Sequence, residues 1–208
     1  MTDRVALIDY GMGNLHSIGK ALETTGANVV ITRNAAEIRA AERVVLPGVG
    51  AIGDTIAELH RLELTDTIMA AIANQPFLGI CVGMQALLTH STENNGVDCL
   101  NALTGQVRHF DDMADTHGLK IPHMGWNTVQ QTQRHPIWNG IADHTRFYFV
   151  HSYFAHPHNP DLIAGTTPYG ITFAAALARD NLFATQFHPE KSHDAGLKLL
   201  ENFVRWHP

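Results

Sequence analysis

The stretch FLGICVG, residues 77–83, contains the clearest structural and chemical signal in the chain. Its first four residues form an apolar run of strand length, and the apolar residues after Gly83 recur at helical spacing. A strand, a tight turn and a helix in this order predict an elbow that presents the side chain of Cys81 outward. Gly79 and Gly83 favour such a turn because they remove Cβ atoms that would clash in a strained backbone.

A cysteine presented at such an elbow is a candidate nucleophile. The N-terminus of the helix that follows would stabilise the thiolate of Cys81. The backbone N–H of Val82, the next residue, could donate to an oxyanion that develops on an attacked carbonyl group. A buried structural cysteine between two incidental glycines is the alternative, and the GxCxG pattern by itself leaves both interpretations open.

A base and an orienting acid for Cys81 follow the strand-like segment 182–187. His188 and Glu190 would leave the carboxyl end of this strand, which is the edge where sites form in open α/β sheets. His188 could accept the thiol proton while Glu190 holds the other ring nitrogen. With 14 histidines in the chain, a histidine near an acid is not diagnostic by itself. The order nucleophile, histidine, acid differs from that of α/β-hydrolases, and no papain-type cysteine motif is present.

A second glycine-containing turn, PGVGA at residues 47–51, follows the apolar run 43–46. Glycine lets the main chain approach a ligand closely or turn an N–H toward it. The turn could therefore supply a second donor to the oxyanion. Taken by itself, the segment is explained more simply as an ordinary strand-to-helix connection.

Short apolar runs alternate with helix-period segments through the first half of the chain. Continuous apolar strands that alternate with helices predict an α/β fold with a mostly parallel central sheet flanked by helices on both faces. Strands are expected at 5–9, 28–32, 43–46 and 77–80. Helices are expected at 15–25, 35–41 and 84–90, with one or two more between 52 and 74.

The second half of the chain has a different pattern, because strand-like segments follow one another with little helix between them. An antiparallel extension of the sheet, or a second small sheet, is expected there. A last helix, with Leu197, Leu200 and Val204 on one face, closes the chain. The strand-like segments lie at 105–110, 126–130, 146–150, 171–178 and 182–187.

Composition limits the class of protein. The 208 residues are 45% apolar and 16% charged, which fits one globular domain over residues 1–208 and excludes a disordered chain or a coiled coil. A net charge of −6 provides no basic field for nucleic acid or an anionic membrane. The N-terminal MTDRVALIDYG is not a signal peptide, and no apolar run approaches the roughly 18 residues of a membrane span.

Cysteine and histidine usage points to a reducing compartment and to chemistry without a metal. Cys81 and Cys99, the two cysteines, are too few for a disulfide framework, so the cytoplasm is the expected location. His151, His156 and His158 do not have the spacing of common zinc sites, and the prolines among them prevent a helix. No P-loop or GxGxxG occurs in the right context, so no nucleotide cofactor is expected.

Taken together, these motifs are similar to those of the class I (triad) glutamine amidotransferases, which combine GxCxG, HPE and an upstream PGxG. Further segments resemble the glutaminase subunits of imidazole glycerol phosphate synthases, and the resemblance runs from Val5 to Trp206. Only the polar, loop-like segment Arg108–Leu119 has no match in the family. The further segments are YGMGN at 10–14, PHMGWN at 122–127, VHSY at 150–153 and HPEKS at 188–192.

The resemblance implies a flavodoxin-like α/β fold and the hydrolysis of L-glutamine to glutamate and ammonia, without cofactor or metal. It implies that Cys81 attacks the side-chain amide of glutamine, that His188 transfers the protons and that Glu190 orients His188. The implied oxyanion donors are Val82 together with Val49 or Gly50. The residues implied to bind glutamine are Gly48, Gln85, Glu93, Ser152 and Tyr153.

The resemblance also implies a partner. Ammonia is protonated at neutral pH, so it must reach its acceptor sheltered from water. In the resembled enzymes a (βα)8-barrel cyclase subunit receives it, and the heterodimer makes imidazole glycerol phosphate and aminoimidazole carboxamide ribotide in histidine biosynthesis. The residues implied to contact this partner or to signal its state are Asn14, His123, Met124, Trp126 and Lys191.

Two other functions have to be weighed against this one. The chain could be the glutaminase of another synthase, such as one for pyridoxal phosphate, guanylate or anthranilate; the segments YGMGN and PHMGWN argue against it. It could also be a catalytically silent binding module with the same fold. The complete set of Cys81, His188 and Glu190 argues against a silent module.

Overall fold

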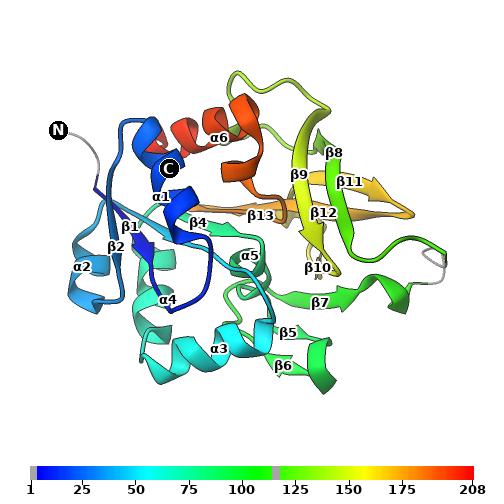
Figure 1. The fold of residues 1–208 in the computed structure, drawn as a ribbon, viewed down its shortest axis with the longest axis horizontal. Coiled ribbons are helices and arrows are strands. Elements are labelled where there is room, and N and C mark those ends of the chain that lie inside the picture. The colour runs from blue at the N-terminus through cyan, green and yellow to red at the C-terminus, as the bar shows by residue number, and fades with distance from the viewer. Residues whose placement is uncertain (1–3, 114–117) are drawn as a thin grey trace.

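A run of five parallel strands, in the order β2–β1–β3–β4–β13, forms the first part of the central sheet. The computed structural model describes residues 4–113 and 118–208, and Figure 1 shows this sheet running through the middle of the molecule. The parallel part agrees with the prediction from the apolar runs. Its strands are β1 (Arg4–Ile8), β2 (Asn28–Thr32), β3 (Arg43–Leu46), β4 (Phe77–Ile80) and β13 (Leu182–Thr185).

Helices cover both faces of the parallel strands. In Figure 1, α1 and α6 lie on one side of the sheet and α3 and α4 lie on the other. Asn14 and Asn34 cap α1 and α2 by accepting hydrogen bonds from backbone N–H groups of the first turn. The helices are α1 (Leu15–Thr24), α2 (Ala35–Ala40), α3 (Ile52–Arg61), α4 (Thr65–Asn74), α5 (Val82–Gln85) and α6 (His193–Arg205).

The second part of the sheet is largely antiparallel, as expected. β12 pairs with β13 and continues through β10, β7, β5 and β6, while β11, β8 and β9 form a branch from β12. The prediction did not include β5, β6, β10 or β11. The strands are β5 (His90–Ser91), β6 (Val97–Asp98), β7 (Gly105–His109), β8 (His123–Gln131), β9 (Thr145–His151), β10 (Tyr153–Pro157), β11 (Ile163–Tyr169) and β12 (Ile171–Arg179).

Short 3₁₀ turns connect several of these strands. One of them, η2, lies in the segment Arg108–Leu119, so this segment is not the simple loop that was predicted. Phe110 at the start of η2 is fully buried among aromatic rings, and residues 114–117 lie outside the described part of the chain. The turns are η1 (Glu93–Asn95), η2 (Phe110–Asp112), η4 (Pro136–Trp138), η5 (Pro160–Leu162) and η6 (Pro189–Lys191).

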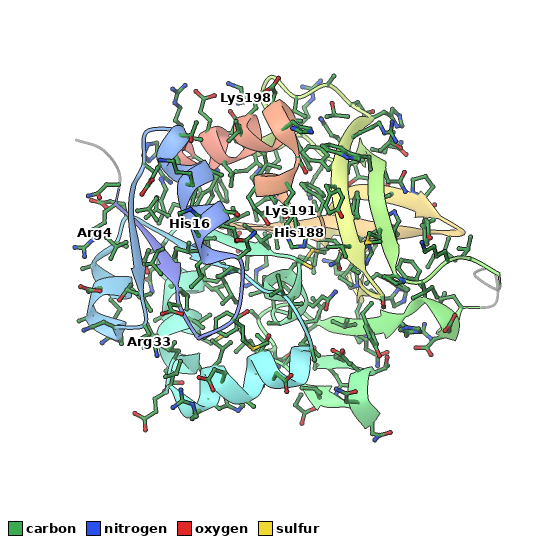
Figure 2. All side chains as sticks on the ribbon, viewed as in Figure 1. Arg4, His16, Arg33, His188, Lys191 and Lys198 are labelled. Carbon is green, nitrogen blue, oxygen red and sulfur yellow. The ribbon has the colours of Figure 1, made fainter. Side chains whose placement is uncertain are left out.

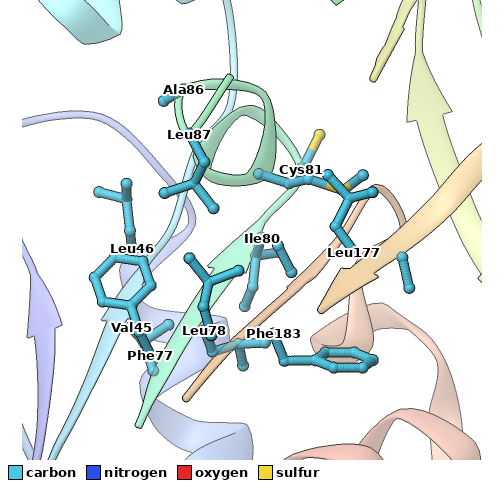
Figure 3. Packing of buried hydrophobic residues seen from close by; sticks show 14 of the residues in the cluster. Val45, Leu46, Phe77, Leu78, Ile80, Cys81, Ala86, Leu87, Leu177 and Phe183 are labelled. Atoms are coloured by element: carbon cyan, nitrogen blue, oxygen red, sulfur yellow. The ribbon is translucent and has the colours of Figure 1, made fainter. Parts of the chain in front are cut away.

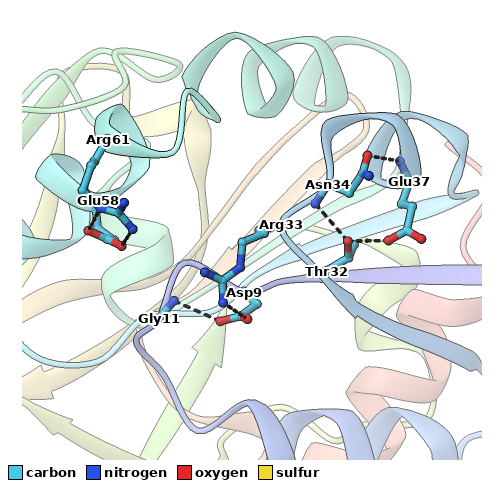
Figure 4. Close-up of polar contacts among 8 residues, drawn as sticks. All are labelled: Asp9, Gly11, Thr32, Arg33, Asn34, Glu37, Glu58 and Arg61. Atoms are coloured by element: carbon cyan, nitrogen blue, oxygen red, sulfur yellow. Dashed lines mark hydrogen bonds and ion pairs between the residues drawn. The ribbon is translucent and has the colours of Figure 1, made fainter.

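Polar contacts hold the loops at the carboxyl ends of β1 and β2 (Figure 4). Asp9 accepts a hydrogen bond from the Gly11 N–H at 3.0 Å and pairs with Arg33 at 2.8 Å. The Gly11 bond, with help from Arg33, lowers the pKa of the Asp9 carboxyl. These contacts fix the start of the turn that leads to Asn14. On the next loop, Thr32 donates to Glu37.

Among residues 4–113 and 118–208, no helix combines the length and the apolar character needed to cross a membrane. The expectation about a signal peptide falls partly on residues 1–3, which lie outside the described residues.

Candidate active site

Cys81 lies at the elbow that the sequence predicts, between β4 and α5. Its backbone has φ 55° and ψ −110°, a combination that non-glycine residues seldom adopt. The Cys81 N–H donates to the Thr185 carbonyl at 2.7 Å, which ties the elbow to the end of β13. Figure 3 shows Cys81 at the end of β4, beyond the packed apolar side chains of Leu78 and Ile80.

Three glycines allow the elbow to form because other backbone segments pass too close for a side chain. A Cβ on Gly83 would lie 2.1 Å from the Leu46 carbonyl oxygen, and one on Gly48 would lie 2.4 Å from the Gly83 nitrogen. A Cβ on Gly79 would lie 3.0 Å from the Gly83 carbonyl oxygen. The glycines of GxCxG and PGVG therefore belong to one packing arrangement, in which the end of β3 presses against the elbow.

His188 and Glu190 form a buried pair next to Cys81. His188 Nδ1 lies 2.9 Å from Glu190 Oε1, and the two side chains are 2% and 0% exposed. Among residues 4–113 and 118–208, no group makes a well-formed hydrogen bond with His188 Nε2, so this atom is available to a reacting group. Burial lowers the pKa of His188, but the sulfur of Cys81 and the carboxylate of Glu190 outweigh burial and raise it to about 10. In Figure 2, His188 lies beside Lys191 near the centre of the molecule.

Cys81 and His188 open onto one cavity of about 280 Å³, which is large enough for an amino acid, and Glu190 lies behind His188. The cavity brings together nearly all residues predicted for catalysis and glutamine binding. His151 and Val150 also line it, although the sequence did not suggest a role for them. The lining residues are Val49, Gly50, Cys81, Val82, Gln85, Glu93, Val150, His151, Ser152, Tyr153, His188 and Lys191.

Gly48 is the predicted glutamine-binding residue that the cavity does not include. It is buried and packs against Val82 and Gly83 instead. Its position lets β3 and the elbow approach each other, and a role of Gly48 in binding glutamine stays a prediction.

The candidate oxyanion donors lie on two sides of Cys81. Val82 is the first residue of α5, and an N–H at the first position of a helix has no acceptor inside that helix. Gly50 has φ 84°, a left-handed conformation that favours glycine. The turn that carries Val49 and Gly50 is held by Tyr10, whose hydroxyl donates to the Pro47 carbonyl at 2.9 Å.

A glutamine pair behind the cavity connects to the cysteine sulfur. Gln85 donates through Nε2 to the Tyr153 carbonyl and to Gln186 Oε1, both at 3.0 Å. Gln186 in turn donates through Nε2 to Cys81 Sγ at 3.6 Å. Gln186 is fully buried, and sequence reasoning missed it. The available signal was a polar side chain between the apolar run 182–185 and Phe187.

Glu93 and Lys191 bring opposite charges to the rim of the cavity. Glu93 accepts a hydrogen bond from the Ile52 N–H at 2.8 Å and so caps α3, whose N-cap residue provides no side-chain bond. Lys191 is exposed, and its ammonium lies 5.9 Å from the centre of the Tyr148 ring.

The residues predicted to meet a partner differ in how far they are exposed. Met124 and Trp126 are 56% and 38% exposed, and the Trp126 ring stacks on His193 with centroids 5.0 Å apart. Asn14 is half-buried and caps α1. His123 is only 4% exposed, so the structure contradicts a direct contact between its side chain and a partner. The alternation along β8 turns His123 inward and Met124 outward.

A cysteine that shares its cavity with a histidine, which a buried carboxylate orients, is typical of enzymes that transfer an acyl group through a thioester. Here this site lies at the carboxyl ends of β4 and β13 in a mostly parallel sheet.

Comparison with known families agrees with this class. The model of the family Glutamine amidotransferase class-I matches residues 6–206, so the chain belongs to the class I glutamine amidotransferases.

Curated relatives of high identity have one name in common, imidazole glycerol phosphate synthase subunit HisH. The chain is 57% identical over 205 residues to the subunit of Pseudomonas putida, with 97% of each chain covered. It is 56% identical to HisH 1 of Pseudomonas aeruginosa, covering 99% of this chain and 98% of the relative. It is 54% identical to HisH of Acinetobacter baylyi, with 98% of each covered.

Solved structures of lower identity have the same fold. PurLQS from Thermotoga maritima has a TM-score of 0.75 at 18% identity, with 99% of each chain covered. A glutamine amidotransferase from the same organism has a TM-score of 0.61 at 17% identity, covering 91% of this chain and 77% of that one. At this identity the likeness concerns the fold alone.

Proposed function

We propose that this chain is the glutaminase subunit of an imidazole glycerol phosphate synthase and acts as one domain over residues 1–208 in the cytoplasm. It hydrolyses L-glutamine and passes the ammonia to a synthase subunit in histidine biosynthesis. Full-length identity of 54–57% to subunits HisH from three organisms supports this assignment. The observation that carries the chemistry is the shared cavity of Cys81 and His188, with Glu190 behind it.

The reaction begins with the Cys81 thiolate and a protonated His188. The sulfur attacks the side-chain amide carbon of glutamine and forms a C–S bond, and the carbonyl electrons move to oxygen. Collapse of this tetrahedral intermediate breaks the C–N bond. The leaving nitrogen takes the proton from His188 Nε2 and departs as ammonia, leaving a glutamyl thioester.

Hydrolysis of the thioester reverses the roles. His188 Nε2, now neutral, accepts a proton from water, and the hydroxide adds to the thioester carbon. Collapse breaks the C–S bond, releases glutamate and restores the ion pair of Cys81 and His188. Glu190 keeps the ring in the orientation that both steps need and stabilises its protonated form.

Backbone N–H groups stabilise the oxyanion in both steps. The Val82 N–H provides one donor, and Val49 or Gly50 provides the second. Removal of one such donor costs roughly 3 kcal/mol of transition-state stabilisation in related chemistry.

The glutamine main-chain groups would lie toward the opposite wall of the cavity. Both protons of Gln85 Nε2 are donated within the protein, so its Oε1 is the atom left to accept from a ligand. The Glu93 carboxylate at the rim suits the α-ammonium group, and Ser152 and Tyr153 suit the α-carboxylate through the backbone between β9 and β10.

The partner we propose is a (βα)8-barrel cyclase subunit that contacts Met124 and Trp126. A large aromatic side chain on a surface is a typical interface anchor. Titration of the barrel subunit by calorimetry should give a dissociation constant at least about tenfold weaker for Trp126→Ala. An unchanged constant would place the interface elsewhere.

The decisive test is ammonia release from glutamine, measured with and without the ligand-bound barrel subunit. Cys81→Ala should abolish glutamine-dependent synthesis while synthesis from added ammonia continues. Cys99→Ala is the matched control, because this second cysteine does not line the cavity. Full glutamine turnover by Cys81→Ala would overturn the proposal. Activity only with a different synthase would assign the chain to that synthase, and failure of Cys81 to react with an electrophilic glutamine analogue would indicate a silent module.

A further inference from the structure

Two buried histidines that the mechanism does not use face each other on neighbouring strands. His123 at the start of β8 is directly opposite His151 at the end of β9 in the antiparallel register. His123 Nδ1 lies 2.9 Å from His151 Nε2, and the residues are 4% and 6% exposed. Aromatic rings enclose them; Tyr169 and Phe149 pack on His123 with centroids 4.1 and 4.9 Å away.

The hydrogen-bond partners fix which ring nitrogens bear protons. His151 Nδ1 lies 2.8 Å from the Tyr153 carbonyl oxygen, which can only accept, so Nδ1 bears a proton. At the other end of the pair, the Asn127 amide nitrogen, which can only donate, lies 3.2 Å from His123 Nε2, so His123 Nε2 accepts. His123 Nδ1 must then donate to His151. His151 Nε2 is therefore the acceptor in the bond between the two rings. The Asn127 amide also donates to the Pro168 carbonyl at 2.9 Å.

Both rings are therefore neutral, each protonated on Nδ1. A second proton on either ring would remove an acceptor that its neighbour needs. Burial lowers the pKa of His123 to about 4. Burial is also the largest cause that lowers the pKa of His151 to about 3, against an opposing effect of the Tyr153 carbonyl.

The series of donors continues into the active site. The Tyr153 carbonyl that accepts from His151 also accepts from Gln85, which donates to Gln186, which donates to the sulfur of Cys81. His151, Tyr153 and Gln85 all line the cavity. A connected set of hydrogen bonds thus extends from Asn127 on β8 to the nucleophile.

At its other end, the series begins in the strand that carries the exposed Met124 and Trp126. His123 precedes Met124, and Asn127 follows Trp126. A partner bound against Met124 and Trp126 would also displace His123, since all three residues belong to the same short stretch of β8. His123 contacts His151, which lines the cavity, so a displacement of His123 has a direct route to the cavity through this contact.

We propose that His123 and His151 are positioning residues. Their hydrogen bonds fix the backbone of Ser152 and Tyr153, which lines the glutamine cavity, relative to the start of β8. The kinetic consequence depends on the proposed function. The positions of the ring protons do not depend on it, so the proton positions and the kinetic effect are tested separately.

The proton positions can be tested on the chain alone. Long-range ¹H–¹⁵N correlation spectra at pH 7 should show His123 and His151 as neutral rings protonated on Nδ1. A protonated ring, or a proton on Nε2 of either residue, would overturn the proposal whatever reaction the protein catalyses.

The positioning role is tested in the complex with the barrel subunit, to which its phosphoribosyl-formimino substrate is bound. His151→Leu should raise the KM for glutamine about tenfold, the loss expected for one buried hydrogen bond, and leave synthesis from added ammonia unchanged. His151→Asn should recover most of the loss, because its amide nitrogen takes the place of Nδ1 and can donate to Tyr153. His156→Leu, at an exposed position of β10, is the control and should match the wild type.

A double-mutant cycle tests whether the two histidines act together. His123→Leu should raise the KM as His151→Leu does, and the double variant should be no worse than His151→Leu alone. Additive losses, or a folded His151→Leu with unchanged KM, would overturn the proposal. Absence of glutamine turnover in the wild-type complex would instead count against the proposed function, which the spectra do not depend on.

Discussion

At His188, burial and neighbouring charge act in opposite directions on a single proton. An isolated buried imidazole prefers to be neutral, as His123 and His135 are in this protein. His188 is equally enclosed, but it lies between the sulfur of Cys81 and the carboxylate of Glu190. Two acidic partners make the protonated ring the stable form, so the site holds the proton that the leaving nitrogen needs.

Removal of the sulfur should therefore release that proton. In Cys81→Ala, the pKa of His188 should fall toward the ordinary value, because burial lowers it and Glu190 alone remains to raise it. A titration of the His188 ring followed by NMR measures the change. Cys99→Ala should leave the titration as in the wild type. A His188 pKa that is the same in Cys81→Ala and the wild type would mean that the two side chains do not interact.

Tyr10 offers a second prediction about a single residue. It is fully buried, burial raises the pKa of its hydroxyl to about 12, and the neutral hydroxyl donates to the Pro47 carbonyl. Tyr10→Phe should lower the free energy of unfolding by about 1–2 kcal/mol, because that carbonyl loses a buried donor. It should also lower the glutaminase kcat, since Val49 and Gly50, the proposed oxyanion donors, follow Pro47 in the same turn. Urea unfolding and steady-state kinetics measure the two effects, and an unchanged kcat would limit Tyr10 to a structural role.

At the scale of elements, the approach of β3 to the elbow determines where the nucleophile lies. Gly48→Ala should lower the free energy of unfolding by more than about 2 kcal/mol and reduce glutaminase activity, because the new Cβ would lie 2.4 Å from the Gly83 nitrogen. Gly19→Ala in the middle of α1 is the matched control. Its Cβ would meet Ile31 at 3.7 Å, an ordinary contact, so this variant should be as stable as the wild type or more so. Chemical denaturation measures the free energy of unfolding of both variants. Equal values would show that the elbow accommodates the new Cβ without loss of stability.

The parallel strands could be predicted from sequence because each is a continuous apolar run, and the elbow could be predicted because glycine spacing is local. The helix expected at 84–90 ends at Gln85 for a reason that lies elsewhere in the chain. The carbonyls of Ala86, Leu87 and Leu88 accept from backbone N–H groups of residues 100–103, so the helix does not continue. The apolar spacing of this segment reflects burial by a distant loop.

The candidate site likewise has a part that local motifs predict and a part that depends on the pairing of distant strands. Cys81, His188 and Glu190 occur in short motifs, whereas the bond from Gln186 to the sulfur exists only because β13 lies beside β4. The pairing of His123 with His151 likewise depends on the register of β8 and β9, which the sequence does not indicate.

On the scale of the whole molecule, neutral buried histidines make the fold sensitive to acid. His123, His135 and His151 lie on different strands and loops, and burial lowers the pKa of each to between about 3 and about 4. In the unfolded chain each would bind a proton near pH 6.5. Between these values the unfolded state binds more protons than the folded state, so the free energy of unfolding must fall as the pH falls.

The expected slope is up to about 1.4 kcal/mol per pH unit for each of the three histidines, beginning below pH 6.5. Urea unfolding at quarter-unit steps from pH 6 to pH 5 measures it. In this range His188, with a pKa of about 10 in the folded protein, is mostly protonated in both states, and carboxyl groups with lowered pKa values, such as Asp9 and Asp143, do not yet titrate. His135→Gln should reduce the slope by about one third, whatever its effect on stability at pH 7. His156→Gln, at an exposed position, should leave the slope unchanged. A free energy of unfolding that is constant over this range would mean that the three rings are protonated in the folded protein.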